Sequence, residues 1–173
     1  MSALIERFID ELERVAGKAQ RAHSDEHACE LLLEIVRDHH VRAVAIAQFS
    51  LAQRLESKLR EVGYELVRGR EIARADIGIS GADLAVAETG SLLISHDGIS
   101  EFVAALPPVH IALIRSEQIV ATLEEAFAFC ERELERAPKD FLFVTGPSRT
   151  ADIELTPVIG VHGPQELIVI ILP

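Results

Sequence analysis

Glu88 is the first residue in this sequence whose type and position could do chemistry. It stands in the short segment Ala87-Glu88-Thr89-Gly90-Ser91, between two apolar stretches. A carboxylate in such a place is costly to desolvate, so it needs hydrogen-bond partners or a raised pKa. A group of this kind can act as a general base or a nucleophile. The same position also suits a carboxylate that caps a turn by accepting hydrogen bonds from loop amides, so both interpretations stay open.

A second loop, residues 146–152, has the composition of an anion site. Backbone N–H groups and hydroxyls that could surround an anion come from Gly146, Ser148 and Thr150. Arg149 adds a planar guanidinium fork that matches a carboxylate or a phosphate. The alternative is a surface loop in which Arg149 pairs with an acidic neighbour, Asp152 or Glu154.

A third loop, residues 160–164, places His162 next to Gly163. A histidine flanked by glycines is approachable and can transfer protons near neutral pH. The alternative is a turn in which the imidazole only satisfies a backbone carbonyl. Ligands of open α/β sheets bind at the carboxyl ends of the strands. We therefore expect Glu88, Arg149 and His162 to approach one cleft, with Gly90 and Gly163 among the ligand-binding glycines.

Composition excludes several classes of function. The 173 residues are 49% hydrophobic and 26% charged, which suits one globular domain rather than a disordered chain. The net charge of −11 would repel a phosphate backbone, so we expect no nucleic-acid partner. Two isolated cysteines suit neither a disulfide framework nor an iron–sulfur cluster, and they favour the reducing cytoplasm. We expect no metal ligands, and no apolar run is long enough for a membrane span.

The loops must be positioned by elements that periodicity predicts. Apolar spacing predicts a helix from Ser2 to about Gln20, within an N-terminal helical segment of residues 1–22. Further helices are expected at residues 25–37, after a Ser50–Gln53 capping box, and at residues 123–136. Expected strands are residues 41–47, 64–67, 85–87, 91–95, 110–114, 141–145 and 167–172. The early strand–helix–strand order predicts an α/β fold with a mostly parallel sheet covered by helices, in a single domain of residues 1–173.

Several segments together make the sequence recognisable. They are residues 75–83 (ADIGISGAD), 87–92 (AETGSL), 106–111 (LPPVHI), 145–154 (TGPSRTADIE) and 160–164 (GVHGP). In this order they resemble the lactate-utilisation protein C family, the LUD-domain proteins. The resemblance implies a fold similar to the sugar-phosphate isomerase and CoA-transferase type. It also implies a role in oxidising L-lactate to pyruvate alongside iron–sulfur partner subunits.

On this resemblance the chain is a cluster-free subunit of a cytoplasmic lactate-oxidising system. We expect it to bind no cofactor itself, and we expect its cleft to take a small carboxylate or phosphate. Whether the cleft is catalytic, and whether the chain forms a homo-oligomer, stays open. Two alternatives are a stand-alone acyl-CoA transferase or sugar-phosphate isomerase-like enzyme, with Glu88 as nucleophile or base, and a non-catalytic assembly or regulatory module.

Overall fold

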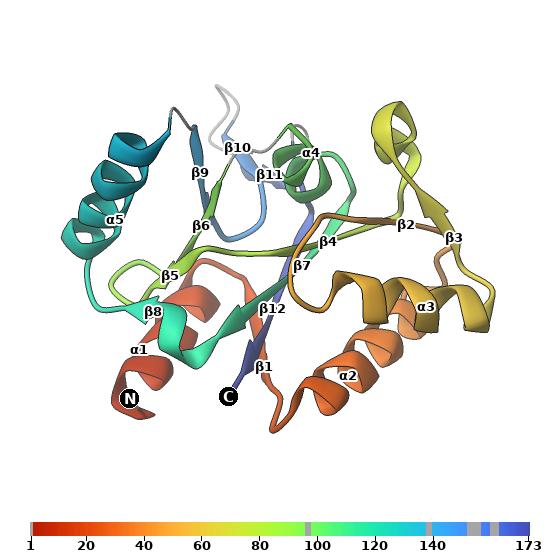
Figure 1. Ribbon diagram of the computed structural model, residues 1–173, viewed down its shortest axis with the longest axis horizontal. Coiled ribbons are helices and arrows are strands. Elements are labelled where there is room, and N and C mark those ends of the chain that lie inside the picture. The colour runs from red at the N-terminus through yellow and green to blue at the C-terminus, as the bar shows by residue number, and fades with distance from the viewer. Residues whose placement is uncertain (1, 96–97, 138–139, 152–156, 160–162) are drawn as a thin grey trace.

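A six-stranded parallel sheet forms the centre of the computed structural model, which describes residues 2–95, 98–137, 140–151, 157–159 and 163–173 (Figure 1). The strand order is β1-β12-β7-β4-β2-β3, and every neighbouring pair is parallel. These strands are β1 (Lys18–Arg21), β2 (Ala43–Ile46), β3 (Glu65–Val67), β4 (Ile77–Gly81), β7 (Val109–Arg115) and β12 (Glu166–Leu172). The predicted α/β class with a mostly parallel sheet is thus confirmed.

Helices α2 (Asp25–Asp38) and α3 (Ala52–Val62) cover one face of this sheet (Figure 1). Alternation along the strands explains how both faces are buried. In β7, Ile111 and Leu113 pack with the two helices, whereas Ala112 and Ile114 belong to the core on the opposite face. Successive side chains of a strand point to opposite faces, so a strand covered on both sides must be apolar throughout.

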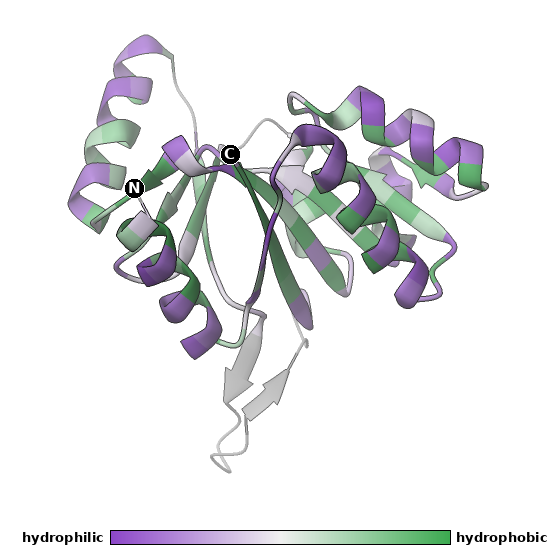
Figure 2. Cartoon of the chain, turned by 90° about the horizontal axis from the view of Figure 1, so that it is seen from below, coloured by the Kyte–Doolittle hydropathy of each residue, from purple (hydrophilic) through white to green (hydrophobic). Residues whose placement is uncertain are grey.

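A second, four-stranded sheet lies against the other face, in the order β8-β5-β6-β9. Its strands are β5 (Leu84–Val86), β6 (Ser91–Ser95), β8 (Ile119–Val120) and β9 (Phe141–Thr145). Helix α5 (Leu123–Arg136) covers its outer side through Ala126 and Cys130. Helix α1 (Ser2–Arg14) packs Phe8 and Leu12 between the two sheets. Figure 2 shows the result, with hydrophobic strands inside and helices that turn hydrophilic residues outward.

Shorter elements complete the chain. Helix α4 (Ser100–Ala105) packs on β4 and β7, and the hairpin strands β10 (Arg149–Ala151) and β11 (Pro157–Ile159) pair antiparallel. Two 3₁₀ turns, η1 (Gly69–Arg74) and η2 (Ser116–Gln118), follow β3 and β7. Gly78 permits the close approach of α4, because a Cβ there would stand 1.9 Å from the carbonyl oxygen of Val103.

The expectation of a helix reaching Gln20 is wrong. The helix ends at Arg14, and residues Lys18–Arg21 form the edge strand β1 beside β12. Ala16 adopts a left-handed conformation with φ of 64°, and the N–H of Gly17 donates to the carbonyl of Leu12. The apolar spacing continues through Ala19, but that side chain packs from a strand rather than from a helix.

Local signals at the other helix ends had mixed outcomes. Ser24 caps α2 by accepting a hydrogen bond from the backbone N–H of His27, and Thr122 caps α5. The predicted cap at Ser50 is wrong, because α3 begins after Leu51 and has no side-chain cap. Strand β4 and helix α4 were not predicted, although β4 lies in the middle of the main sheet.

Candidate functional site

Two of the predicted loops meet in the structure. Gly146, Ser148 and Gly163 line one cavity of about 420 Å³, here called the glycine-loop cavity. The N–H of Ser148 donates to the carbonyl of Pro164 over 2.7 Å, which joins the loops directly. Ala104 and Ala105 of α4 and Val15, just beyond α1, complete the walls. The lining is mainly backbone and small or apolar side chains.

The glycines of these loops make room for the chain at the end of α1. A Cβ on Gly146 would lie 2.2 Å from the carbonyl oxygen of Val15, and one on Gly90 would lie 2.4 Å from the backbone nitrogen of Leu12. Both glycines also have positive φ values, 69° and 64°, which side-chain-bearing residues rarely adopt. Packing and backbone conformation therefore account for glycine at both positions, and their ligand-binding role stays a prediction.

Glu88 lies in the turn between β5 and β6 and is exposed. Its Oε2 accepts a hydrogen bond of 2.9 Å from the backbone N–H of Leu123, the first residue of α5. A carboxylate is stabilised there by the positive end of the helix dipole. This contact matches the capping interpretation of Glu88, while a catalytic role stays a prediction.

The turn that holds Glu88 is linked to the glycine-loop cavity by hydroxyl groups. Thr89 Oγ1 and Ser91 Oγ lie 2.7 Å apart, and Ser91 Oγ lies 2.7 Å from Thr145 Oγ1. Thr145 lines the cavity and directly precedes Gly146. These hydroxyl contacts join the start of β6 to the end of β9. They therefore hold the turn that contains Glu88 at a fixed position relative to the loop that begins at Gly146.

The remaining predicted residues are placed only in part. Arg149 and Thr150 belong to β10, where they pair with Ile159 and Val158 of β11. His162 lies outside the described residues, as do the acidic neighbours proposed for Arg149. The convergence of Glu88, Arg149 and His162 in one cleft therefore stays a prediction.

The reason given for that convergence is wrong. Gly163 and Pro164 lie shortly before β12, and the N–H of Gln165 donates to the carbonyl of Pro108, just before β7. These loops thus lie toward the amino ends of the parallel strands. Glu88 lies in a turn between two antiparallel strands of the second sheet, which is mixed rather than parallel. The carboxyl ends of the parallel strands lie elsewhere, away from the three loops that the sequence singled out as candidate sites.

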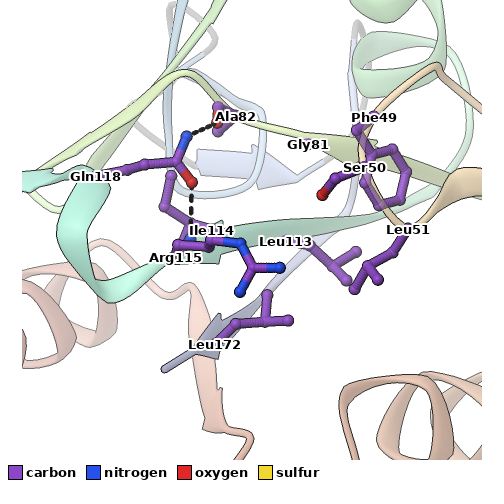
Figure 3. A pocket seen from close by; sticks show the side chains of 10 residues that line it. All are labelled: Phe49, Ser50, Leu51, Gly81, Ala82, Leu113, Ile114, Arg115, Gln118 and Leu172. Atoms are coloured by element: carbon purple, nitrogen blue, oxygen red, sulfur yellow. Dashed lines mark hydrogen bonds between the residues drawn. The ribbon is translucent and has the colours of Figure 1, made fainter. Parts of the chain in front are cut away.

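A second cavity, of about 160 Å³, opens at those carboxyl ends (Figure 3). The chain runs from β2 to β3 on one side and from β4 to β7 on the other, so the neighbours β2 and β4 mark a topological switch point. Ligands of open α/β sheets bind at such points. We call this the switch-point cavity; its lining residues are Phe49, Ser50, Leu51, Gly81, Ala82, Leu113, Ile114, Arg115, Gln118 and Leu172.

Arg115, at the end of β7, is held in place from two sides. Its backbone N–H donates to Gln118 Oε1 over 2.9 Å, and Gln118 Nε2 donates to the carbonyl of Ala82 at 3.0 Å (Figure 3). Gln118 Nε2 also donates to the carbonyl of Asp83 at 3.0 Å. On the other side, Nη2 of Arg115 lies 3.1 Å from each carboxylate oxygen of Asp25. The ends of β4 and β7 are thereby fixed together around the arginine.

His110 is a buried polar residue that sequence reasoning passed over. Its side chain is fully buried in β7, and Nε2 lies 2.9 Å from Ser80 Oγ. Among the described residues, Nδ1 has no hydrogen-bond partner. Burial lowers the pKa of His110 to about 4, so the ring is neutral at physiological pH.

Neither cysteine is a reactive thiolate. Cys29 and Cys130 are buried in separate clusters, and burial raises the pKa of each thiol. Across the described part of the chain, no group of three or more potential ligands could hold a metal ion. Within the same ranges, no helix has the length and apolar character needed to cross a membrane.

Comparison with known proteins identifies the family to which this chain belongs. The sequence model of the LUD domain matches residues 5–172, so the chain belongs to the LUD domain family.

Particular relatives carry a common name. The chain is 38% identical over 130 residues to Lactate utilization protein C of Halalkalibacterium halodurans, covering 68% of this chain and 54% of that protein. The protein of that name from Anoxybacillus flavithermus is 29% identical over 179 residues, covering 95% and 80% respectively. The chain spans about half the length of the first curated relatives it matches, from 43% to 54%.

A solved structure supports the architecture. It is the crystal structure of a DUF162 family protein from Deinococcus radiodurans, with a TM-score of 0.73 over 99% of this chain and 98% of that one. The sequence identity is 23%, so this likeness shows the fold alone.

Proposed function

We propose that the chain works in lactate utilisation, as a subunit of a cytoplasmic system that oxidises L-lactate to pyruvate. The observation that carries this is the 38% identity over 130 residues to a protein named Lactate utilization protein C. Membership of the LUD domain family, which spans residues 5–172, supports it.

The reaction requires an electron acceptor. Converting L-lactate to pyruvate removes two electrons and two protons. Iron–sulfur clusters on partner subunits would supply one-electron acceptors, two of which balance the two electrons, and the two protons would pass to solvent. The two buried cysteines of this chain, with their raised pKa values, suit a subunit without a cluster of its own.

The ligand would be a small carboxylate or phosphate held beside the glycine loops. Arg149 would supply the guanidinium fork, and Gly146, Ser148 and Thr150 would add N–H and hydroxyl donors. Glu88 or His162 would move a proton. The cavity that Gly146, Ser148 and Gly163 share supports this placement, because it provides a space beside two of the loops.

Growth tests the proposal most directly. Deletion of the gene should abolish or strongly slow growth on L-lactate as sole carbon source, while growth on pyruvate stays normal. A plasmid-borne copy should restore growth. The tagged chain should also co-purify with subunits that contain iron and acid-labile sulfide.

Three outcomes would redirect the proposal. Normal growth on lactate after deletion, without a second gene of the same family, would overturn it. Turnover of an acyl-CoA or a sugar phosphate by the isolated chain would favour the stand-alone enzyme. Normal lactate growth of strains carrying Glu88→Gln, Arg149→Ala or His162→Gln would favour a non-catalytic module within the system.

A further inference from the structure

The guanidinium of Arg115 is only partly used by the protein. Nη2 lies 3.1 Å from both Asp25 oxygens, whereas Nη1 and Nε have no partner among the residues that the structure describes. Its side chain is 33% exposed and borders the switch-point cavity. Arginine offers five N–H donors in a fixed plane, so an arginine anchored through one nitrogen keeps donors for a ligand.

The cavity has a polar side and an apolar side. Arg115 and Gln118 lie across from Ser50 and Phe49, while Leu113 and Leu172 line the wall between them (Figure 3). Gln118 is occupied by its bonds to Ala82, Asp83 and Arg115, so it shapes the wall rather than offering a free donor. A ligand therefore meets one cationic donor group and several apolar side chains.

Size and charge restrict the ligand further. The volume of about 160 Å³ is below the ~300–1,000 Å³ of sites for drug-sized molecules, so the occupant has only a few non-hydrogen atoms. A single guanidinium, already sharing its charge with Asp25, suits a monoanion better than a phosphate dianion. Asp83, which follows the lining residue Ala82, is engaged by the N–H and hydroxyl of Ser95 at 2.6 and 2.8 Å.

From these observations we infer that the switch-point cavity binds a short-chain monocarboxylate, with its carboxylate on Arg115 and its short apolar body against Leu113 and Leu172. Ser50 donates a hydroxyl at the opposite rim. Among the residues that the structure describes, this site shares no lining residue with the glycine-loop cavity. The inference stands on this geometry and does not require a role in lactate metabolism.

Titration of the purified full-length chain tests the site. The probes are acetate, L-lactate, pyruvate and inorganic phosphate, followed by amide chemical shifts in an isotope-labelled sample. Carboxylates should shift the amides of Ser50, Gly81 and Arg115 in a saturable way. Phosphate should bind at least several-fold more weakly. Shifts confined to residues 145–148 would overturn the inference, as would tighter binding of phosphate than of any carboxylate.

Two substitutions with opposite expected effects separate a ligand-binding arginine from a structural one. Arg115→Gln should weaken carboxylate binding about tenfold or more, the loss expected for a charged hydrogen-bond partner. Asp25→Asn should strengthen it several-fold, because the guanidinium then keeps its full charge and another donor. Arg115→Lys should bind with intermediate affinity, since it retains charge without the fork.

A matched control guards against general effects of charge. Arg74 is an exposed arginine paired with Glu65, so Arg74→Gln should bind as the parent chain does. Spectra of each variant report whether it is folded. A folded Arg115→Gln with unchanged affinity would overturn the inference. So would an Asp25→Asn that binds as weakly as Arg115→Gln, because the ion pair would then only shape the loop.

Discussion

The glycine-loop cavity and the switch-point cavity differ in what their walls supply. The first is bounded by backbone, small residues and the chain after α1, and its Gly146 is required by the packing of that chain. The second is bounded by strand ends and holds a guanidinium with unused donors. A group of glycines in a sequence thus indicates close packing as readily as a ligand, whereas a partly paired charge at strand ends points to binding.

The largest effect that would sharpen this comparison is expected at Gly146. A Cβ added at Gly146 would lie 2.2 Å from the carbonyl oxygen of Val15, and φ of Gly146 is 69°. Gly146→Ala should lower the free energy of unfolding by about 2–4 kcal/mol, from left-handed strain plus overpacking. Urea unfolding measures the loss.

Gly63→Ala is the matched control for that experiment. Gly63 has a φ of 97°, but a Cβ added there would have no atom within 4 Å. It should lose only the conformational part, about 1 kcal/mol. Equal losses for the two variants would show that the contact with Val15 is unimportant.

Gly81, in the wall of the switch-point cavity, should be more tolerant. A Cβ there would meet the Phe49 side chain at 2.9 Å, and φ is not positive. Gly81→Ala should cost about 1–2 kcal/mol from overpacking against Phe49 Cβ, because no left-handed backbone strain adds to it as it does at Gly146. The same unfolding assay measures it. A loss as large as that of Gly146→Ala would break the distinction between the two cavities.

The amino end of the main sheet carries a pH-dependent contact. His39 Nε2 lies 3.0 Å from Glu166 Oε2, and Lys18 pairs with the other carboxylate oxygen of Glu166. Burial opposes protonation of His39, but hydrogen bonds to Glu166 and the Ile35 carbonyl, with the charge of Glu166, outweigh it and raise the pKa. A raised pKa means that folding favours the protonated ring.

The stability from His39 is therefore complete below the unfolded pKa of about 6.5 and is lost as pH rises through the folded pKa. His39→Gln should lower the free energy of unfolding by about 0.5 kcal/mol more at pH 5.5 than at pH 8.5, as for a partly exposed pair. Denaturant titrations at both pH values measure this. The matched control is His40→Asn, because His40 is the exposed neighbour of His39. A loss of stability for His39→Gln that does not change with pH would contradict a stabilising ion pair between His39 and Glu166.

The smallest effect is expected at Glu88. Glu88→Gln keeps an oxygen for the Leu123 N–H but removes the charge from the start of α5, so the cost should be about 0.3 kcal/mol, the low end for an exposed charge at a helix start. Thermal unfolding measures it. If Glu88→Gln folds normally but its strain no longer grows on lactate, the result would support a catalytic role for Glu88. The catalytic site would then lie beside the glycine loops rather than at the switch-point cavity.

Local sequence predicted much of the fold for identifiable reasons. The strands at 91–95 and 141–145 match the structure, because short apolar runs between turn signals are local features. The helix end at Gly63 and the caps at Ser24 and Thr122 are likewise set by nearby backbone groups. Five segments in order, residues 75–83, 87–92, 106–111, 145–154 and 160–164, were also enough to identify the LUD domain family.

Contacts between distant segments decided the rest. Lys18–Arg21 became a strand because β12, some 150 residues later, offers it an edge to pair with. Arg115 drew no attention in the sequence, since its surroundings come from Asp25, Gln118 and the ends of other strands. The sequence by itself determined the elements and the family, through local propensity and motif order. The tertiary structure alone decided which strand ends meet, because strand order depends on packing between segments that no local pattern records.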